Sequence, residues 1–134
     1  ENGEQEKGIL DGVPLSFPAL NQSQEYQDRA ARVGFDWPEI DRVLDKLMEE
    51  IEEIRQARNT EELASEIGDL FFVLVNFARW QGVDAESALR EANIRFKYRF
   101  SYIEKHARKE GHPMTEMTLD EMEALWQEAK ELKS

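Results

Sequence analysis

The chain contains no cysteine, and its 134 residues include only seven glycines and four prolines. Without cysteine it can form neither disulfides nor a zinc–thiolate site. No apolar run approaches the roughly 20 residues that a membrane-spanning helix needs, so no membrane partner is expected. The opening residues, ENGEQEKG, are polar and acidic and do not resemble a signal peptide. The cytoplasm is therefore the expected location.

Basic residues are also scarce, with 17 Lys and Arg against 29 Asp and Glu and a net charge of −12. This balance argues against binding the backbone of a nucleic-acid duplex. It does not exclude a single nucleotide, because bound Mg²⁺ and a few local cations can hold the phosphates. The composition, with 40% hydrophobic and 34% charged residues, is typical of a soluble globular chain. The length predicts one domain.

Strand signals are absent, and helical periodicity runs through most of the chain. We expect residues 1–13 to form a flexible tail or linker and residues 14–134 to form a helical domain. Five helices are expected, with Ser16, Asp36, Thr60, Asp84 and Thr118 as their N-terminal caps. They should end near Arg32, Asn59, Gln81, Gly111 and Lys133. The short connections predict an all-α, antiparallel helical bundle.

Four carboxylates form two pairs on consecutive expected helices. Glu50 and Glu53 are three residues apart, and so are Glu66 and Asp69, so each pair shares a helical face. The second pair precedes the stretch 70–78, LFFVLVNFA, which is apolar on nearly every side. Buried charges form ion pairs or bind a metal, because desolvating them alone is costly. If the chain had only one such carboxylate pair, ion pairs with distant Lys or Arg side chains would explain it. Two carboxylate pairs on consecutive helices favour a bound Mg²⁺ ion, for which Mn²⁺ can substitute.

The same apolar stretch predicts how the chain assembles. A helix that is apolar on all sides must be buried. A single small bundle would leave one side of it exposed to water, and a second subunit would cover that side. We therefore expect a homodimer or a larger homo-oligomer.

Lys46 lies near the first carboxylate pair. It is separated from Glu49, Glu50 and Glu53 by three, four and seven residues, so the four side chains form one patch. Lys46 can make an ordinary helical ion pair with Glu50, or it can hold a phosphate oxygen beside a metal. Glu49 is a candidate for supporting the metal ligands or for orienting a water molecule.

A second basic feature lies on the fourth expected helix. Arg95 and Arg99 are one turn apart, above small residues, and can form either a solvated basic face or a clamp for a polyphosphate. Asn93 is a candidate ligand for ribose or phosphate. The tryptophans, Trp126 among them, are more typical of packing residues than of base-stacking platforms.

The carboxylate spacing also matches a known family. EEIEE at 49–53, followed by EIGD at 66–69, resembles the EExxE…ExxD signature of the MazG nucleoside triphosphate pyrophosphohydrolases. Other stretches resemble the C-terminal domain of two-domain MazG proteins: VGFDW at 33–37, GDLFFVLVNFAR at 68–79, ANIRFKYRF at 92–100 and MEALWQEAK at 122–130. LDGVPLSFPAL at 10–20 resembles the linker that enters this domain. The resemblance covers roughly residues 10–132.

The resemblance implies an all-α bundle that dimerises through its central helices. It implies that the Mg²⁺ ligands are Glu50, Glu53, Glu66 and Asp69. Glu49, which lies beside them in the sequence, joins them in our candidate catalytic set. It also places a nucleotide against Arg95, Arg99 and Trp126. Lys46 and Asn93 remain candidate substrate contacts from their positions in the sequence. Arg95 stands where the family often has Lys, and the geometry of phosphate contact differs between the two.

The implied activity is Mg²⁺-dependent hydrolysis of a nucleoside triphosphate to the monophosphate and pyrophosphate. Its implied role is the removal of non-canonical or excess nucleotides. Two alternatives remain on the same residues. One is a dUTP- or dCTP-specific hydrolase or a phosphoribosyl-ATP pyrophosphohydrolase of the same architecture. The other is a non-catalytic helical dimerisation module that retains a metal site.

Overall fold

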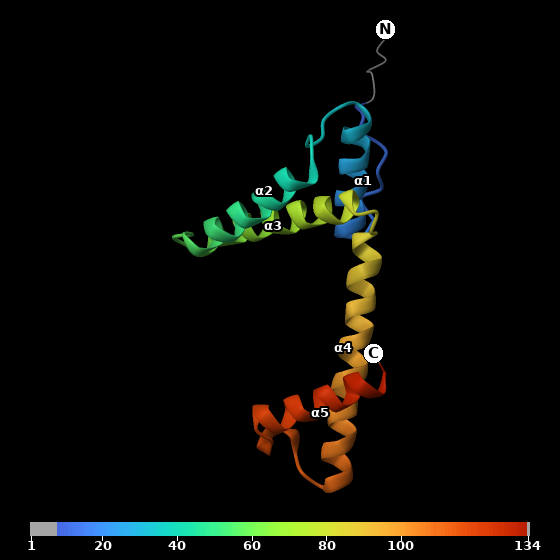
Figure 1. Cartoon of the computed structure of the whole chain (residues 1–134), viewed down its shortest axis with the longest axis vertical. Helices are drawn as coiled ribbons and strands as arrows, with labels where there is room; N and C mark the ends of the chain where they lie inside the picture. Colours follow the sequence, from blue (N-terminus) through green and yellow to red (C-terminus); the bar gives the residue numbers. More distant parts are fainter. Residues whose placement is uncertain (1–7, 134) are drawn as a thin grey trace. The chain divides into compact units, whose positions relative to one another are not determined.

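The computed structural model describes residues 8–133, and every regular element in this range is helical (Figure 1). The elements, in chain order, are α1 (Ala19–Arg32), α2 (Ile40–Arg55), α3 (Thr60–Trp80), α4 (Ala85–Glu110), the short 3-10 helix η1 (Met114–Glu116) and α5 (Leu119–Leu132). The predicted all-α class is confirmed. None of the described helices is both long and apolar enough to cross a membrane.

The chain divides into two compact units, and the boundary falls between Ala88 and Leu89, inside α4. The first unit holds α1, α2, α3 and the first residues of α4. The second unit holds the rest of α4, together with η1 and α5.

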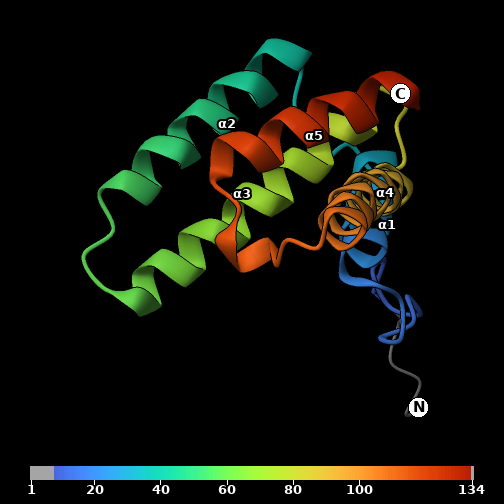
Figure 2. The same ribbon diagram turned by 90° about the horizontal axis from the view of Figure 1, so that it is seen from below.

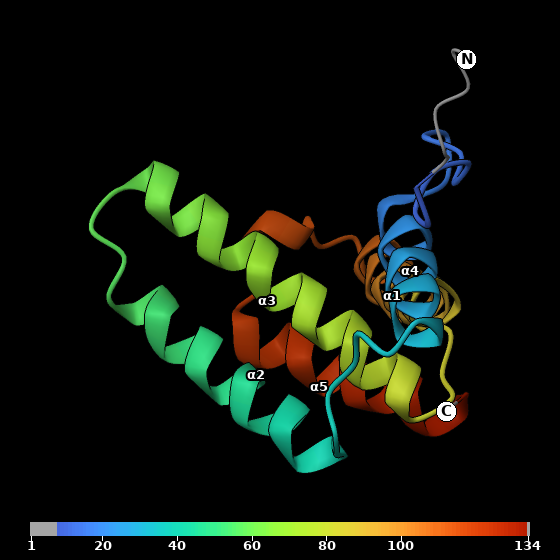
Figure 3. The same ribbon diagram turned by 90° about the horizontal axis from the view of Figure 1, so that it is seen from above.

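In the first unit, α2 and α3 lie side by side and run antiparallel, as the short connection between them predicts (Figures 1 and 3). Helix α1 instead crosses the C-terminal part of α3 steeply, so the three helices do not form a uniformly antiparallel bundle (Figure 1). The connection from Val33 to Glu39 is long enough to permit this turn. Val43, Val73 and Val75 are buried between the helices.

In the second unit, η1 and α5 return from the C-terminal end of α4 (Figures 1 and 2). The ring of Trp126 packs against Phe96, with 5.5 Å between the ring centroids. Ile103 and Ala107 on α4 and Ala129 on α5 are buried. A hydrogen bond from the Tyr102 hydroxyl to Glu128 joins α4 to α5 and raises the pKa of Tyr102 to about 12.

Two of the predicted helix caps are confirmed by their hydrogen bonds. Asp84 Oδ2 accepts from the backbone N–H of Ser87 at 3.0 Å at the start of α4. At α5, Thr118 Oγ1 accepts from the Glu121 N–H at 3.1 Å, and Glu121 Oε1 accepts from the Thr118 N–H at 2.8 Å. This reciprocal pair is a capping box, and it confirms Thr118 as the cap of α5. The predicted end near Gln81 is also confirmed: α3 ends at Trp80, and Gly82, with a φ of 70°, donates its N–H to Arg79 O.

The other three cap predictions are wrong. Helix α1 begins at Ala19 after Pro18, with no side-chain cap from Ser16. Asn59, not Thr60, caps α3, because its Oδ1 accepts from the Glu62 N–H at 2.8 Å. Asp36 does not cap α2, and its carboxylate instead binds residues of α3, described below.

Helix α3 was predicted to be buried on nearly every side, and the single chain does not achieve this. Phe71, Phe72 and Leu74 remain about half exposed, at 54%, 49% and 50%. Val73, Val75 and Asn76 on the same helix are buried. One side of α3 therefore packs on α1 and α2, and the other presents large apolar side chains to solvent.

Candidate functional site

The antiparallel packing of α2 and α3 brings three of the predicted carboxylates together. Glu50 and Glu53 share one face of α2, and Glu66 approaches them from α3. Each contributes a carboxylate oxygen, and these oxygens all lie within 4.8 Å of one another. Glu50 is buried, with 3% of its surface exposed, while Glu53 and Glu66 are partly exposed. We call these three residues the acidic cluster.

The acidic cluster is strained electrostatically, and Glu66 shows this most clearly. A hydrogen bond shared with the Glu53 carboxyl raises the pKa of Glu66 to about 7. Burial and the negative charges of Glu53 and Glu50 act in the same direction. Near neutral pH the cluster therefore holds either a proton or another positive charge.

Two oxygens of the cluster also lack a hydrogen-bond donor. Glu50 Oε2 and Glu66 Oε2 are buried, and no described residue donates to either of them. Buried carboxylate oxygens are normally hydrogen-bonded, paired with a cation or bound to a metal. Mg²⁺ and Mn²⁺ favour oxygen ligands of this kind. The donor set and its unpaired oxygens therefore fit a divalent hard cation.

Asp69, the fourth predicted ligand, is not part of this group of three. It lies on the exposed surface of α3, three residues after Glu66.

Lys46 makes the helical ion pair with Glu50 that the sequence spacing allowed. Its Nζ lies 3.1 Å from Glu50 Oε1 and 3.2 Å from Glu49 Oε1. The hydrogen bond to Glu50 raises the pKa of Lys46 the most, and the bond to Glu49 acts in the same direction. The Glu49 side chain is 57% exposed.

Two of the predicted nucleotide contacts meet in the second unit. The Arg99 guanidinium carbon lies 5.4 Å from the ring centroid of Trp126, which is a cation–π contact. Arg99 Nε is buried, and no described residue accepts its hydrogen. Trp126 also packs on Phe96, which agrees with its predicted role as a packing residue. Asn93 and Arg95 lie on the exposed surface of α4.

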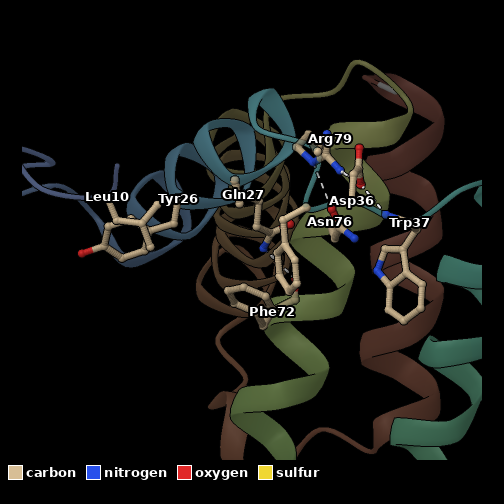
Figure 4. Close-up of a pocket in the computed structure, with 11 residues that line it drawn as sticks. Leu10, Tyr26, Gln27, Asp36, Trp37, Phe72, Asn76 and Arg79 are labelled. Carbon is tan, nitrogen blue, oxygen red and sulfur yellow. Dashed lines mark hydrogen bonds and ion pairs between the residues drawn. The ribbon is translucent and has the colours of Figure 1, made fainter. Parts of the chain in front are cut away.

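The structure also shows a polar network that sequence reasoning missed. Asp36 Oδ1, just before α2, accepts from Arg79 Nη2 at 2.5 Å and from Trp80 Nε1 at 3.2 Å. Arg79 Nε in turn donates to Asn76 Oδ1 at 3.0 Å. This network borders a cavity of about 520 Å³ whose lining includes Gln27 and Phe72 (Figure 4). The one signal in the sequence was Asn76, a lone amide inside the apolar stretch LFFVLVNFA.

Comparison with known proteins gives a consistent result. Residues 18–96 match the family model described as phosphoribosyl-ATP pyrophosphohydrolase. The chain is 44% identical over 126 residues to a nucleoside triphosphate pyrophosphohydrolase of Escherichia coli strain K12, which covers 90% of the chain and 48% of that protein. It is 35% identical over 130 residues to the nucleoside triphosphate pyrophosphohydrolase/pyrophosphatase MazG of Thermotoga maritima, which covers 97% of the chain and 51% of that protein.

The chain thus spans about half the length of these curated relatives. Their names confirm the resemblance to MazG proteins that the carboxylate spacing first indicated. The family match includes the whole of α1, α2 and α3 and therefore the entire acidic cluster. The chain belongs to the phosphoribosyl-ATP pyrophosphohydrolase family.

Proposed function

We propose that the chain is a metal-dependent pyrophosphohydrolase that cleaves a nucleoside triphosphate between its α and β phosphates. The products are the nucleoside monophosphate and pyrophosphate. The observation that carries this proposal is the acidic cluster with its two unpaired, buried oxygens. The names of the curated relatives supply the reaction.

Glu50, Glu53 and Glu66 are the residues that would hold Mg²⁺ or Mn²⁺ in this proposal. Asp69 lies about one helical turn beyond Glu66 on α3 and is the candidate for a fourth ligand. When bound, the cation polarises the phosphoryl oxygens and offsets the negative charge that develops during cleavage.

Other side chains would position the reactants. Lys46 Nζ would hold the Glu50 carboxylate in place through its 3.1 Å contact. It would also bind a phosphate oxygen of the substrate. Glu49, whose carboxylate is exposed, is the candidate for orienting the attacking water. Arg95 and Arg99 would bind the polyphosphate, and Asn93 would bind the ribose or a phosphate. Trp126 would hold Arg99 in orientation through the cation–π contact.

We also propose that the chain assembles as a homodimer or a larger homo-oligomer. The half-exposed Phe71 and Leu74 support this, because they are three residues apart and share one apolar face of α3. A second copy that packs on this surface would bury it and complete the predicted environment of the helix.

Two alternatives are worth testing beside the main proposal. Phosphoribosyl-ATP is a second candidate substrate, because the matching family model carries that description. It contains the same α–β phosphoanhydride, so the acidic cluster could serve the same reaction. A non-catalytic helical dimerisation module that retains the metal site is the other alternative.

Pyrophosphate release from ATP, dUTP, dCTP and phosphoribosyl-ATP, measured with the full chain and Mg²⁺, separates these functions. Glu53→Gln should lower the rate by orders of magnitude, because it removes a charged ligand at nearly constant size. Glu52→Gln is the matched control, since Glu52 is the exposed neighbour on α2. A chelator should abolish turnover and leave the far-ultraviolet circular dichroism nearly unchanged. Full activity in excess chelator, or in Glu53→Gln, would refute the metal mechanism.

A further inference from the structure

Helix α5 crosses α4 steeply in the second unit, so only a short stretch of each helix meets the other (Figures 1 and 2). In the described part of this unit, the buried side chains are Ile103, Ala107 and Ala129. Hydrophobic stabilisation is roughly proportional to the apolar area buried, so this small core leaves α5 room to pivot about the crossing. The orientation of α5 on α4 therefore depends on the contacts of its larger side chains.

Two contacts between larger side chains lie next to each other at this crossing. The first is the cation–π contact between Arg99 on α4 and Trp126 on α5. The second is the hydrogen bond that the Tyr102 hydroxyl donates to Glu128 Oε1. Tyr102 lies three residues after Arg99, which is less than one helical turn. Glu128 lies only two residues after Trp126. Two neighbouring contacts resist a rotation of α5 that either contact alone would allow.

Of these two contacts, the hydrogen bond is the one that fixes a direction. A cation–π contact allows the guanidinium to slide over the ring, whereas a hydrogen bond to a carboxylate requires alignment. The charge also makes this bond stronger than one between neutral groups. The bond raises the pKa of Tyr102 to about 12, so the hydroxyl remains a donor even in alkaline buffers. His106 Nε2 lies 3.9 Å from Glu128 Oε1, which is too far for a hydrogen bond.

The guanidinium of Arg99 depends on the ring of Trp126 for its orientation. The guanidinium carbon lies 5.4 Å from the ring centroid. Arg99 Nε is buried, and no described residue accepts its hydrogen. The group therefore retains hydrogen-bonding capacity for an anionic ligand, and a planar guanidinium binds phosphate well only in a defined orientation. Any movement of Trp126 would change that orientation.

We propose that the hydrogen bond between Tyr102 and Glu128 is a latch that holds Trp126 against Arg99 and thereby orients the guanidinium for the phosphates of the substrate. Tyr102 and Glu128 are then positioning residues, because they act on the substrate only through Trp126 and Arg99. The inference rests on the proposed function for the presence of a polyphosphate. It adds the two residues that set the geometry of the basic contact.

The test compares variants that break the latch with variants that keep it. Tyr102→Phe removes the hydroxyl and keeps the ring. Glu128→Gln keeps an acceptor, because an amide carbonyl can receive the Tyr102 hydrogen. Tyr98→Phe is the matched control, since it makes the same change on α4 and retains the ring that faces Lys133. Steady-state kinetics with the triphosphate that is hydrolysed best are measured for each variant, alone and combined with Arg99→Ala.

Tyr102→Phe should lower kcat/KM by about 3- to 10-fold, and Glu128→Gln and Tyr98→Phe by less than about twofold. In the Arg99→Ala background, Tyr102→Phe should have almost no further effect, because the side chain that the latch positions is gone. A purely structural role for Tyr102 would lower activity by the same factor in both backgrounds, and that result would overturn the proposal. So would a loss below about twofold in Tyr102→Phe alone.

A second measurement needs no turnover. The ring of Trp126 should shift the nuclear magnetic resonance signal of the Arg99 Nε–H in the ligand-free chain, and Arg99→Lys identifies that signal by removing it. Tyr102→Phe and Glu128→Ala, which break the latch from either side, should move the signal, whereas Glu128→Gln and Tyr98→Phe should leave it in place.

This signal also separates the inference from the proposed function. If no nucleotide is hydrolysed, the proposed function fails, and the signal alone decides whether the latch orients Arg99. Movement of the signal in both variants that break the latch supports the inference. A signal at the wild-type position in both of them refutes it.

Discussion

The acidic cluster should bind a divalent cation with an affinity that depends on pH in a specific way. A cation competes with the proton on Glu66, whose pKa is about 7. One pH unit below that value, only about a tenth of the carboxyl groups are ionised. The apparent affinity for Mg²⁺ should therefore fall about tenfold for each pH unit between about 7 and 5. Above pH 7.5 it should be nearly constant.

Glu66→Gln tests the assignment of this proton. The variant should bind Mg²⁺ more weakly at pH 8, because one charged ligand is lost. Its affinity should be nearly flat between pH 7 and 5, because the competing proton is also lost. Glu61→Gln is the matched control, since Glu61 is exposed in the first turn of the same helix. Isothermal titration calorimetry with Mg²⁺ across this pH range gives the affinities.

The same proton should change folding stability in the absence of a cation. Glu66 has a higher pKa in the folded chain than in the unfolded chain, so the folded state binds the proton more tightly. Stability should therefore fall as pH rises from about 4.5 to about 7 and stay lower above that range. When a chelator removes divalent cations, thermal melts of Glu66→Gln should show no such loss of stability between about pH 4.5 and about pH 7. Mg²⁺ should raise Tm more at pH 8 than at pH 5. A wild-type Mg²⁺ affinity that changes less than twofold between pH 8 and pH 6 would refute the reasoning.

Three further predictions follow from individual contacts. Arg99→Ala should lower kcat/KM for a triphosphate by about 10- to 150-fold, against little change in the control Arg108→Ala, and a loss below about threefold would remove Arg99 from the site. Asn59→Ala should lower the free energy of unfolding by about 1 kcal/mol in urea denaturation, and Thr60→Ala by less than about 0.5, while the reverse order would restore Thr60 as the cap. Sedimentation should show a dimer or larger species at micromolar concentration, with Phe71→Glu shifting it toward monomer, whereas a wild-type monomer of 15.7 kDa would contradict the assembly.

Local signals in the sequence predicted most of the helices. Asp84 and the Thr118–Glu121 box cap their helices through bonds within three residues, so no distant partner was needed to find them. Asp36 was misassigned because its partners, Arg79 and Trp80, are 43 and 44 residues away. A carboxylate that finds a distant guanidinium is no longer available as a local cap, and sequence spacing cannot show that competition.

The candidate site was predictable to a similar degree. Spacing placed Glu50 and Glu53 on one helix face and Glu66 on the next helix, and antiparallel packing then brought the three together. Gln27 was not predictable, because α1 carries many polar residues and nothing in their order shows which one α3 buries. The amide nitrogen of Gln27 bonds to Ser23 and to the Phe72 carbonyl, and its buried Oε1 is left without a donor among the described residues. Only the folded positions of these residues reveal this.

The position of bond cleavage tests the central claim most directly. Phosphorus-31 nuclear magnetic resonance of ATP, CTP, dUTP and dCTP, each incubated with the full chain and Mg²⁺, identifies the products without coupling enzymes. The account predicts a nucleoside monophosphate and pyrophosphate in equal amounts from at least one nucleotide, at a rate that Glu53→Gln lowers by orders of magnitude. A nucleoside diphosphate with inorganic phosphate, or no product from any of the four, would contradict it.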